Sequence, residues 1–340
     1  MKDVLIAGGG PVGLATALYA ARAGLDVAVV EPRSAPIDKA CGEGLMPGAV
    51  AALQDLDVTV SGMDFRGIRY TNGTHEARAL FSVGMGRGVE RTELHAALHS
   101  RVLEQGIPII DDMVTAVEQH EDRVQAAGFS AKYLIGADGL HSPVRRLSGM
   151  EAASARPNLA RWGQRCHFDM PPWSDLVEVH WSEHAEAYVT PLGRNRVGVA
   201  VLSQQRGSFT QHLAGFPDLV NRIAGIEASP VRGAGPLRQA STQRVRGRVL
   251  LVGDAAGYVD ALTGEGLAVG FASARQLIGC IRGGQPARYE KQWLQTSRRY
   301  RMITGSLLWA ARKPVLRKKI VPLAAAVPPL FGYLVRQIAR

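Results

Sequence analysis

Short, almost continuously apolar runs recur along the chain, each followed by glycine or by an acidic residue. Such runs are typical of strands that are covered on both faces in a parallel sheet, where no polar face is needed. We expect four buried strands of this kind, at residues 4–7, 26–30, 133–137 and 248–252.

Other stretches alternate apolar and polar residues, which predicts strands of a second, antiparallel sheet. Residues 63–81 alternate around Asn72 and Gly73, a pair typical of a hairpin turn. Further strands of this sheet are expected at residues 161–168, 177–181, 185–190 and 196–202. Shorter strands are expected at residues 107–110, 114–120 and 123–127.

Apolar residues at helical spacing predict helices between these strands. Thr92 is expected to be the N-cap of a helix that ends at Gly106, and Ser142 followed by Pro143 predicts another helix start. The remaining helices are expected at residues 14–23, 48–56, 211–223 and 264–282.

The most specific motif follows the first predicted strand. Gly8, Gly10 and Gly13 fit G-x-G-x-x-G, with Pro11 and Val12 between the last two. In a strand–turn–helix unit these glycines permit a tight turn, a close approach to a pyrophosphate and close packing of helix on strand. Glu31 ends the next strand, where an acid accepts hydrogen bonds from an adenosine ribose. The motif therefore predicts a dinucleotide site.

A second anchoring site late in the chain favours FAD over NAD as that dinucleotide. Gly253 and Asp254 end a buried strand at the sheet edge where doubly wound folds bind ligands. Residues 263–266 then open a helix, whose N-terminus would present a positive dipole to the N1–O2 edge of a reduced flavin. A transiently bound NAD needs no such site, so we expect FAD.

The order of the elements predicts an α/β (α+β) fold with a Rossmann-like FAD-binding domain assembled from separated segments. This domain is expected to comprise residues 1–60, 86–155 and 245–300. An inserted antiparallel β-sheet forms the substrate domain, expected at residues 61–85 and 156–244. Residues 301–340 form a basic, apolar, helical C-terminal tail.

Composition and charge also indicate which class of protein this chain belongs to. Apolar residues make up 46% of the chain and charged residues 21%, as in globular proteins. Three widely spaced cysteines favour a reducing compartment, with no disulfide framework and no metal site, so we expect a cytoplasmic protein. Residues 281–340 hold 13 basic residues and one acidic residue, a net +12, whereas residues 1–280 carry a net −2.

The tail places this charge beside apolar sequence. Residues 320–335 are uncharged and include three prolines, and the run is shorter than the ~20 residues that span a bilayer. Two alternatives stay open: residues 303–340 contact the cytoplasmic face of a membrane peripherally, or they pack as terminal helices over the substrate cavity. Both suit a lipophilic substrate, and no nucleic-acid partner is expected.

These motifs resemble those of the para-hydroxybenzoate hydroxylase-type flavoprotein monooxygenases and of the related geranylgeranyl reductase-like flavoproteins. The matching stretches are residues 8–13 with Glu31, residues 136–139 and residues 253–256, and the resemblance reaches to about residue 300. It implies that Asp254 holds the flavin ribityl chain, that Asp138 and Gly139 lie near the cofactor, and that Arg91 contacts the flavin. The expected cofactor-binding set is completed by Arg33, Gly264, Gly266 and Leu267.

Two reactions are compatible with this resemblance. The leading hypothesis is a monooxygenase that uses NADH or NADPH as a transient reductant and O₂ to form a flavin C4a-hydroperoxide, which hydroxylates a lipophilic aromatic, quinone-precursor or polyketide-type substrate. The alternative is a geranylgeranyl reductase-like enzyme that saturates isoprenoid C=C bonds, which the Cys-Gly-Glu-Gly-Leu stretch at residues 41–45 favours. A non-catalytic lipid-escort protein on the same fold is a lesser alternative, because the cofactor motifs are intact.

The candidate catalytic residues are Cys41, Glu43 and Arg91. Cys41 and Glu43 alternate with glycines, so backbone is expected to approach a bound molecule closely there. His141 is a further candidate in the Asp-Gly stretch.

Overall fold

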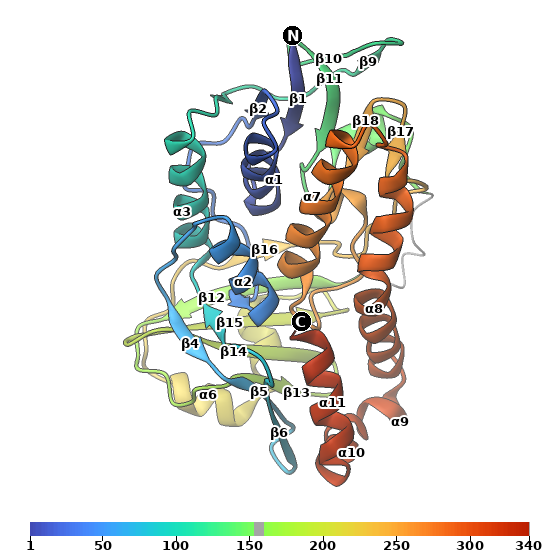
Figure 1. Ribbon diagram of the computed structural model, residues 1–340. Coiled ribbons are helices and arrows are strands. Elements are labelled where there is room, and N and C mark those ends of the chain that lie inside the picture. Colours follow the sequence, from blue (N-terminus) through green and yellow to red (C-terminus); the bar gives the residue numbers. More distant parts are fainter. Residues whose placement is uncertain (153–159, 340) are drawn as a thin grey trace.

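Figure 1 shows the computed structural model, which describes residues 1–152 and 160–339. Helix α1 (Pro11–Arg22) lies between α3 (Arg91–Glu104) and α7 (Gly266–Arg282) beside one sheet. A second sheet lies below it, and a long helix, α8 (Arg288–Ala311), runs along both. The predicted domain boundary at residues 155–156 and the terminal Arg340 lie outside the described residues.

The first sheet has the strand order β17-β18-β11-β1-β2-β8, and β10 and β9 extend it beside β11. Its core is parallel: Val4 of β1 lies opposite Val27 of β2 and Tyr133 of β11. Because these strands are covered on both faces, they are almost purely apolar, as predicted. Their bounds are β1 Lys2–Ala7, β2 Val27–Val30, β8 Ile109–Ile110, β9 Glu118–Gln119, β10 Val124–Ala126, β11 Phe129–Gly136, β17 Val245–Arg246 and β18 Val249–Leu251.

The second sheet has the order β16-β12-β15-β14-β13-β5-β6. The predicted hairpin is confirmed, since β5 and β6 pair antiparallel across Asn72 and Gly73. The bounds are β5 Gly67–Thr71, β6 Glu76–Leu80, β12 Trp162–Phe168, β13 Val177–Trp181, β14 Ala185–Gly193, β15 Arg196–Ser203 and β16 Arg232–Ala234. A third, small sheet joins β3 (Gly44–Leu45), β7 (Gly86–Gly88) and β4 (Met63–Phe65).

The helices pack on these sheets by their apolar faces. Helix α1 starts at Pro11, directly after the glycine turn, and packs against α7 and α3. The bounds are α1 Pro11–Arg22, α2 Pro47–Asp55, α3 Arg91–Glu104, α4 Pro143–Leu147, α5 Phe209–Leu213, α6 Pro217–Ile223, α7 Gly266–Arg282, α8 Arg288–Ala311, α9 Pro314–Arg317, α10 Ile320–Ala326 and α11 Pro328–Ile338.

Three local predictions were wrong. Thr92 is not the N-cap of α3, which is Glu90; instead the Glu43 carboxylate, from a distant loop, accepts a hydrogen bond from the Arg91 N–H. The helix predicted at residues 211–223 is two short helices, because Pro217 starts α6 and disfavours helical backbone at Phe216. Of the strand predicted at residues 114–120, only β9 forms.

The tail helices pack against the second sheet. Helices α10 and α11 contact β6, and Phe331 stacks near Tyr70 of β5, with ring centroids 4.9 Å apart. Among the described residues no single helix is long and apolar enough to cross a membrane, and only the bent pair Pro314–Ala326 and Pro328–Ile338 passes that test together.

A buried ion pair fastens the tail to β14. Arg317 Nη1 lies 2.6 Å from Glu186 Oε1, and the same guanidinium donates hydrogen bonds to the carbonyls of Ser182 and Ala185. Arg161 contacts the other oxygen of Glu186. All three ionic groups are buried and have lost their contacts with water. Each is therefore stabilised only by its charged and hydrogen-bonding partners.

We expect Arg317→Met to lower the free energy of unfolding by about 3 kcal/mol, because one partner of a buried pair is removed. Amide hydrogen exchange should become faster in α9–α11 and stay unchanged in α1 and β1. Lys318→Met removes an exposed neighbour 3.7 Å from Glu183 and is the matched control, with little expected effect. Equal stability of the two variants would contradict the role of Arg317.

Candidate functional site

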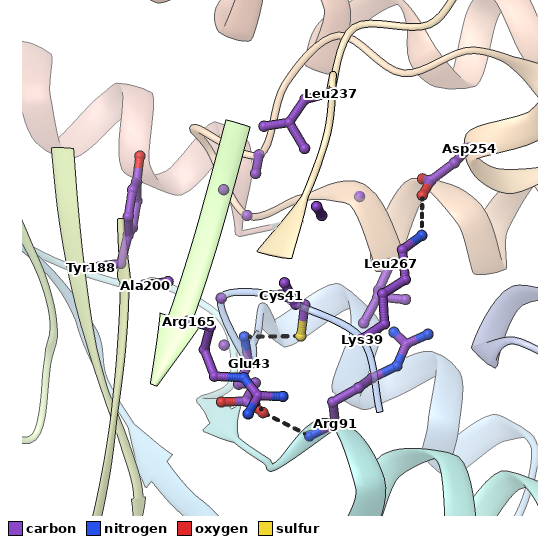
Figure 2. Close-up of a pocket in the computed structure, with 18 of the residues that line it drawn as sticks. Lys39, Cys41, Glu43, Arg91, Arg165, Tyr188, Ala200, Leu237, Asp254 and Leu267 are labelled. Atoms are coloured by element: carbon purple, nitrogen blue, oxygen red, sulfur yellow. Dashed lines mark hydrogen bonds and ion pairs between the residues drawn. The ribbon is translucent and has the colours of Figure 1, made fainter. Parts of the chain in front are cut away.

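A cavity of about 510 Å³ is lined by residues from both large sheets. One end is formed by the dinucleotide motifs and the other by the second sheet, so the two halves of the molecule share one continuous space. The loop at residues 41–45, which we name the cysteine loop, lies between them (Figure 2).

Most of the residues predicted from the sequence line this cavity. They are Gly10, Pro11, Val12, Arg33, Cys41, Glu43, Arg91, Asp138, Gly139, Gly253, Asp254, Gly264, Gly266 and Leu267. The other three predicted residues, Gly8, Gly13 and Glu31, are not among the lining residues: Gly8 and Gly13 belong to the turn itself, and Glu31 hydrogen-bonds to it. His141 also lines the cavity.

The glycine turn is held by close backbone approaches. A Cβ on Gly13 would lie 1.9 Å from the Gly8 carbonyl oxygen, and Gly8 itself has a φ of +106°. Glu31 stabilises the turn by accepting a hydrogen bond from the Gly9 N–H at 2.8 Å. Burial would raise the pKa of Glu31, but hydrogen bonds from Arg33 and Gly9 together lower it.

The cavity end at the turn is suited to an anionic group. The first turn of α1 has no side-chain cap, so its N–H groups and the helix dipole are directed at the cavity. Arg91 reaches the same end, and within the described residues its buried Nε has no hydrogen-bond partner. An unpartnered buried guanidinium beside an open helix N-terminus fits a pyrophosphate.

His95 supports the turn from one helical turn beyond Arg91. Its side chain is 1% exposed, and Nε2 donates to the Gly9 carbonyl at 2.9 Å. Burial, together with the nearby Arg91 and His99, lowers the pKa of His95 to about 4. The imidazole is therefore neutral at pH 7 and holds the turn without repelling Arg91.

Glu43 lies at the centre of a buried polar cluster. Oε1 accepts the Arg91 N–H at 2.9 Å and lies 3.5 Å from Arg165 Nε, and Oε2 lies 2.7 Å from His167 Nε2. Its φ of +57° is unusual for a residue with a side chain. The three contacts hold it in this conformation and join α3 to β12 of the second sheet.

Cys41 lies beside Glu43 on the cysteine loop, with its Sγ accepting a hydrogen bond from the Glu43 N–H at 3.3 Å. Burial, assisted by the nearby Glu43, raises the pKa of Cys41 to about 11. The side chain is therefore a neutral thiol near pH 7, in contrast to the low-pKa cysteines of thiol nucleophiles.

Asp254 and Asp138 also line the cavity, with the backbone of Asp138 close to Gly8 of the turn. Lys39 Nζ lies 3.8 Å from Asp254 Oδ2 (Figure 2). Asp138 accepts the Val144 N–H with one oxygen, while its buried Oδ1 has no partner in the part of the chain that the structure describes. Burial raises the pKa of Asp138. Such acceptors suit the hydroxyl groups of a ribityl or ribose chain.

The far wall of the cavity is mostly apolar, and Gln164, Arg165 and Thr190 are its polar members. Tyr188 of β14 and Ala200 of β15 face the cysteine loop across the space (Figure 2), and the Tyr188 hydroxyl donates to the Leu262 carbonyl at 3.0 Å. The remaining wall residues come from β5, β13, β15, the loops around them and α11, and are Ile68, Tyr70, Val177, Val179, Leu202, Leu237, Leu262 and Ile338.

Sequence reasoning missed His95, Lys39, Arg165 and His167. His95 could have been found, because it lies four residues after Arg91 and therefore on the same helix face. Arg165 and His167 alternate along a strand that is otherwise largely buried, which is also a readable signal. Nothing in the local sequence indicates the position of Lys39.

A parallel sheet with a glycine turn, an uncapped helix N-terminus and carboxylates at its carboxyl edge defines a dinucleotide-binding flavoprotein. The sequence profile of the family described as FAD binding domain matches residues 1–281, and the chain belongs to that family. The predictions of the fold class, of FAD as cofactor and of an FAD-dependent oxidoreductase are thereby confirmed.

Named relatives agree with this class. The chain is 28% identical to menaquinone reductase of Mycolicibacterium smegmatis, over 86% of this chain and 79% of the relative. It is 26% identical to digeranylgeranylglycerophospholipid reductase of Methanosarcina acetivorans, over 87% and 81%. A geranylgeranyl bacteriochlorophyll reductase-like structure from Thermoplasma acidophilum shares the fold, with a TM-score of 0.80 at 20% identity over 95% of this chain and 91% of that chain.

We expect Arg91→Met to weaken FAD binding about tenfold or more, because a charge-assisted hydrogen bond to phosphate is lost. The free energy of unfolding of the FAD-free protein should not fall, since no buried partner of Arg91 Nε is left behind. Fluorescence titration with FAD measures the first quantity and chemical denaturation the second. Arg101→Met, on the exposed side of α3, is the control, and unchanged affinity in Arg91→Met would refute the assignment.

The low pKa of His95 predicts a pH-dependent stability. The unfolded chain binds a proton near pH 6.5 and the folded protein only near pH 4, so this contribution to stability is complete above pH 6.5 and is lost as the pH falls toward 4. Between pH 7 and pH 5 the wild type should lose about 2 kcal/mol more unfolding free energy than His95→Gln does. Parallel pH profiles of the two proteins would count against a buried neutral His95.

Proposed function

We propose that this FAD-dependent oxidoreductase is an NAD(P)H-consuming monooxygenase that hydroxylates a lipophilic aromatic, quinone-precursor or polyketide-type substrate. The observation that carries the proposal is the continuous cavity that leads from the dinucleotide motifs to a mostly apolar wall. A bound flavin supplies electron transfer and oxygen activation, and the protein's part is to bind, orient and exclude water.

The wall residues have the positions that such a task requires. Tyr188 is held by its hydrogen bond to Leu262, so its ring offers a fixed apolar face opposite the cysteine loop. The side chains around it carry few polar atoms, which favours an aromatic or alkyl group over a sugar or an amino acid. Arg91 and Arg165 add positive charge to the cavity lining.

The contacts of the Glu43 carboxylate count against C=C reduction. Reduction of a C=C bond requires a proton donor at the carbon that does not receive the hydride. Both oxygens of Glu43 are already engaged with Arg91, Arg165 and His167, and a Cys41 thiol with a pKa of about 11 is a weak acid. The Glu43 carboxylate is therefore not arranged as a proton donor, and the Cys41 thiol, which keeps its proton near pH 7, releases it less readily than an ordinary thiol.

Saturation of isoprenoid C=C bonds is the second candidate. It is favoured by two named reductases among the relatives and by the position of the cysteine loop at the cavity. In that reaction Cys41 and Glu43 would line the substrate site, and the lipophilic wall would hold a prenyl chain. The two candidates differ in their need for O₂.

The test is oxidation of NADH and NADPH by the FAD-loaded protein, with a panel of alkylphenols and prenylated quinones, in air and without oxygen. We expect a substrate to stimulate oxidation only in air, and mass spectrometry to find one oxygen atom from ¹⁸O₂ in the product. Ala200→Phe, which narrows the cavity at its wall, should lower the substrate stimulation at unchanged FAD content. A product whose prenyl chain gains two hydrogens under anaerobic conditions, as distinct from reduction of the quinone ring to the quinol, would instead assign the reductase.

A further inference from the structure

The outward face of the C-terminal helices is apolar where solvent-facing helices are normally polar. Helix α11 buries Phe331, Val335 and Ile338 against the second sheet, yet its opposite face carries Leu330 and Tyr333, which are 55% and 54% exposed. Helix α11 therefore carries apolar side chains both on the face that packs on the protein and on the face that is exposed to solvent.

Neighbouring segments extend this surface, which we name the tail patch. Its exposed apolar members are Trp309, Val315, Leu323, Val327, Leu330, Tyr333 and Leu334. Three exposed lysines, Lys313, Lys318 and Lys319, belong to the same segment, between α8 and α10. Apolar side chains with tryptophan and tyrosine, bordered by lysines, are typical of surfaces that enter the headgroup layer of a bilayer.

We propose that the tail patch docks on an anionic lipid bilayer, with its apolar side chains in the headgroup layer and its lysines on anionic lipids. Charge complementarity supports an anionic bilayer as the binding partner, because residues 281–340 carry a net charge of +12 while the rest of the chain carries −2. A second copy of the chain is disfavoured as occupant, since a two-fold contact through this patch would bring two strongly basic segments together.

The patch has a fixed position relative to the cavity. Arg317 anchors α9 to Glu186, and the Gly48 N–H donates to the Ala339 carbonyl at the end of α11. Ile338 of the same helix lines the apolar wall of the cavity, next to Tyr70 and Ile68. A docked bilayer would therefore lie against the helix that contributes Ile338 to the cavity wall, so a substrate dissolved in the bilayer has a short path to the cavity.

The path of the substrate rests on the proposed function, whereas the docking itself does not. The test is flotation of the FAD-loaded protein with vesicles of phosphatidylcholine alone or with phosphatidylglycerol, at low and high ionic strength. We expect flotation with the phosphatidylglycerol vesicles at low ionic strength. Leu330→Ser/Tyr333→Ser/Leu334→Ser should weaken it about tenfold or more, and Lys313→Gln/Lys318→Gln/Lys319→Gln about a hundredfold.

Leu103→Ser/Met113→Ser removes exposed apolar side chains outside the patch and should float like the wild type. The proposal is overturned if the wild type does not float with anionic vesicles, or if the serine variant floats equally well. It is also overturned if the wild type is a dimer that the serine variant dissociates. Turnover of a detergent-dispersed substrate, measured in parallel, tests the proposed function separately, because it needs no bilayer.

Discussion

The two halves of the molecule are joined through the buried carboxylate of Glu43. It caps α3 of the dinucleotide-binding half through the Arg91 N–H and contacts His167 and Arg165 of the second sheet. Because a buried carboxylate without partners is costly, these contacts must form together. They set the cysteine loop between cofactor and wall, and they fix the start of the helix from which Arg91 reaches the pyrophosphate end.

The cost of a buried polar group without a partner also bears on the end of the cavity at the glycine turn. Arg91 Nε and Asp138 Oδ1 lack hydrogen-bond partners within the described residues, and the first turn of α1 has no side-chain cap. Each unsatisfied group costs stability, and FAD supplies acceptors and hydroxyl groups that match them. We therefore expect cofactor binding to stabilise the fold as well as to enable the chemistry.

Much of this could be predicted from local sequence. Patterns within about thirty residues predict the parallel strands, the glycine turn and Asp254. The two residues Asn72 and Gly73 are enough to predict the hairpin. The cap of α3 could not, because Glu43 lies 48 residues before Arg91, and neither could the contact of Glu43 with His167, 124 residues away. Periodicity predicts which residues are buried, not which distant partner satisfies a buried charge. The domain boundaries and residue roles stay predictions.

The most direct test of this account is a crystal structure of the protein with FAD bound. The account predicts electron density for the pyrophosphate at the first turn of α1 beside Arg91, and for the isoalloxazine ring in the cavity between Asp254 and the wall that contains Tyr188. A flavin ring bound outside the cavity would contradict the claim that cofactor and lipophilic substrate share one space.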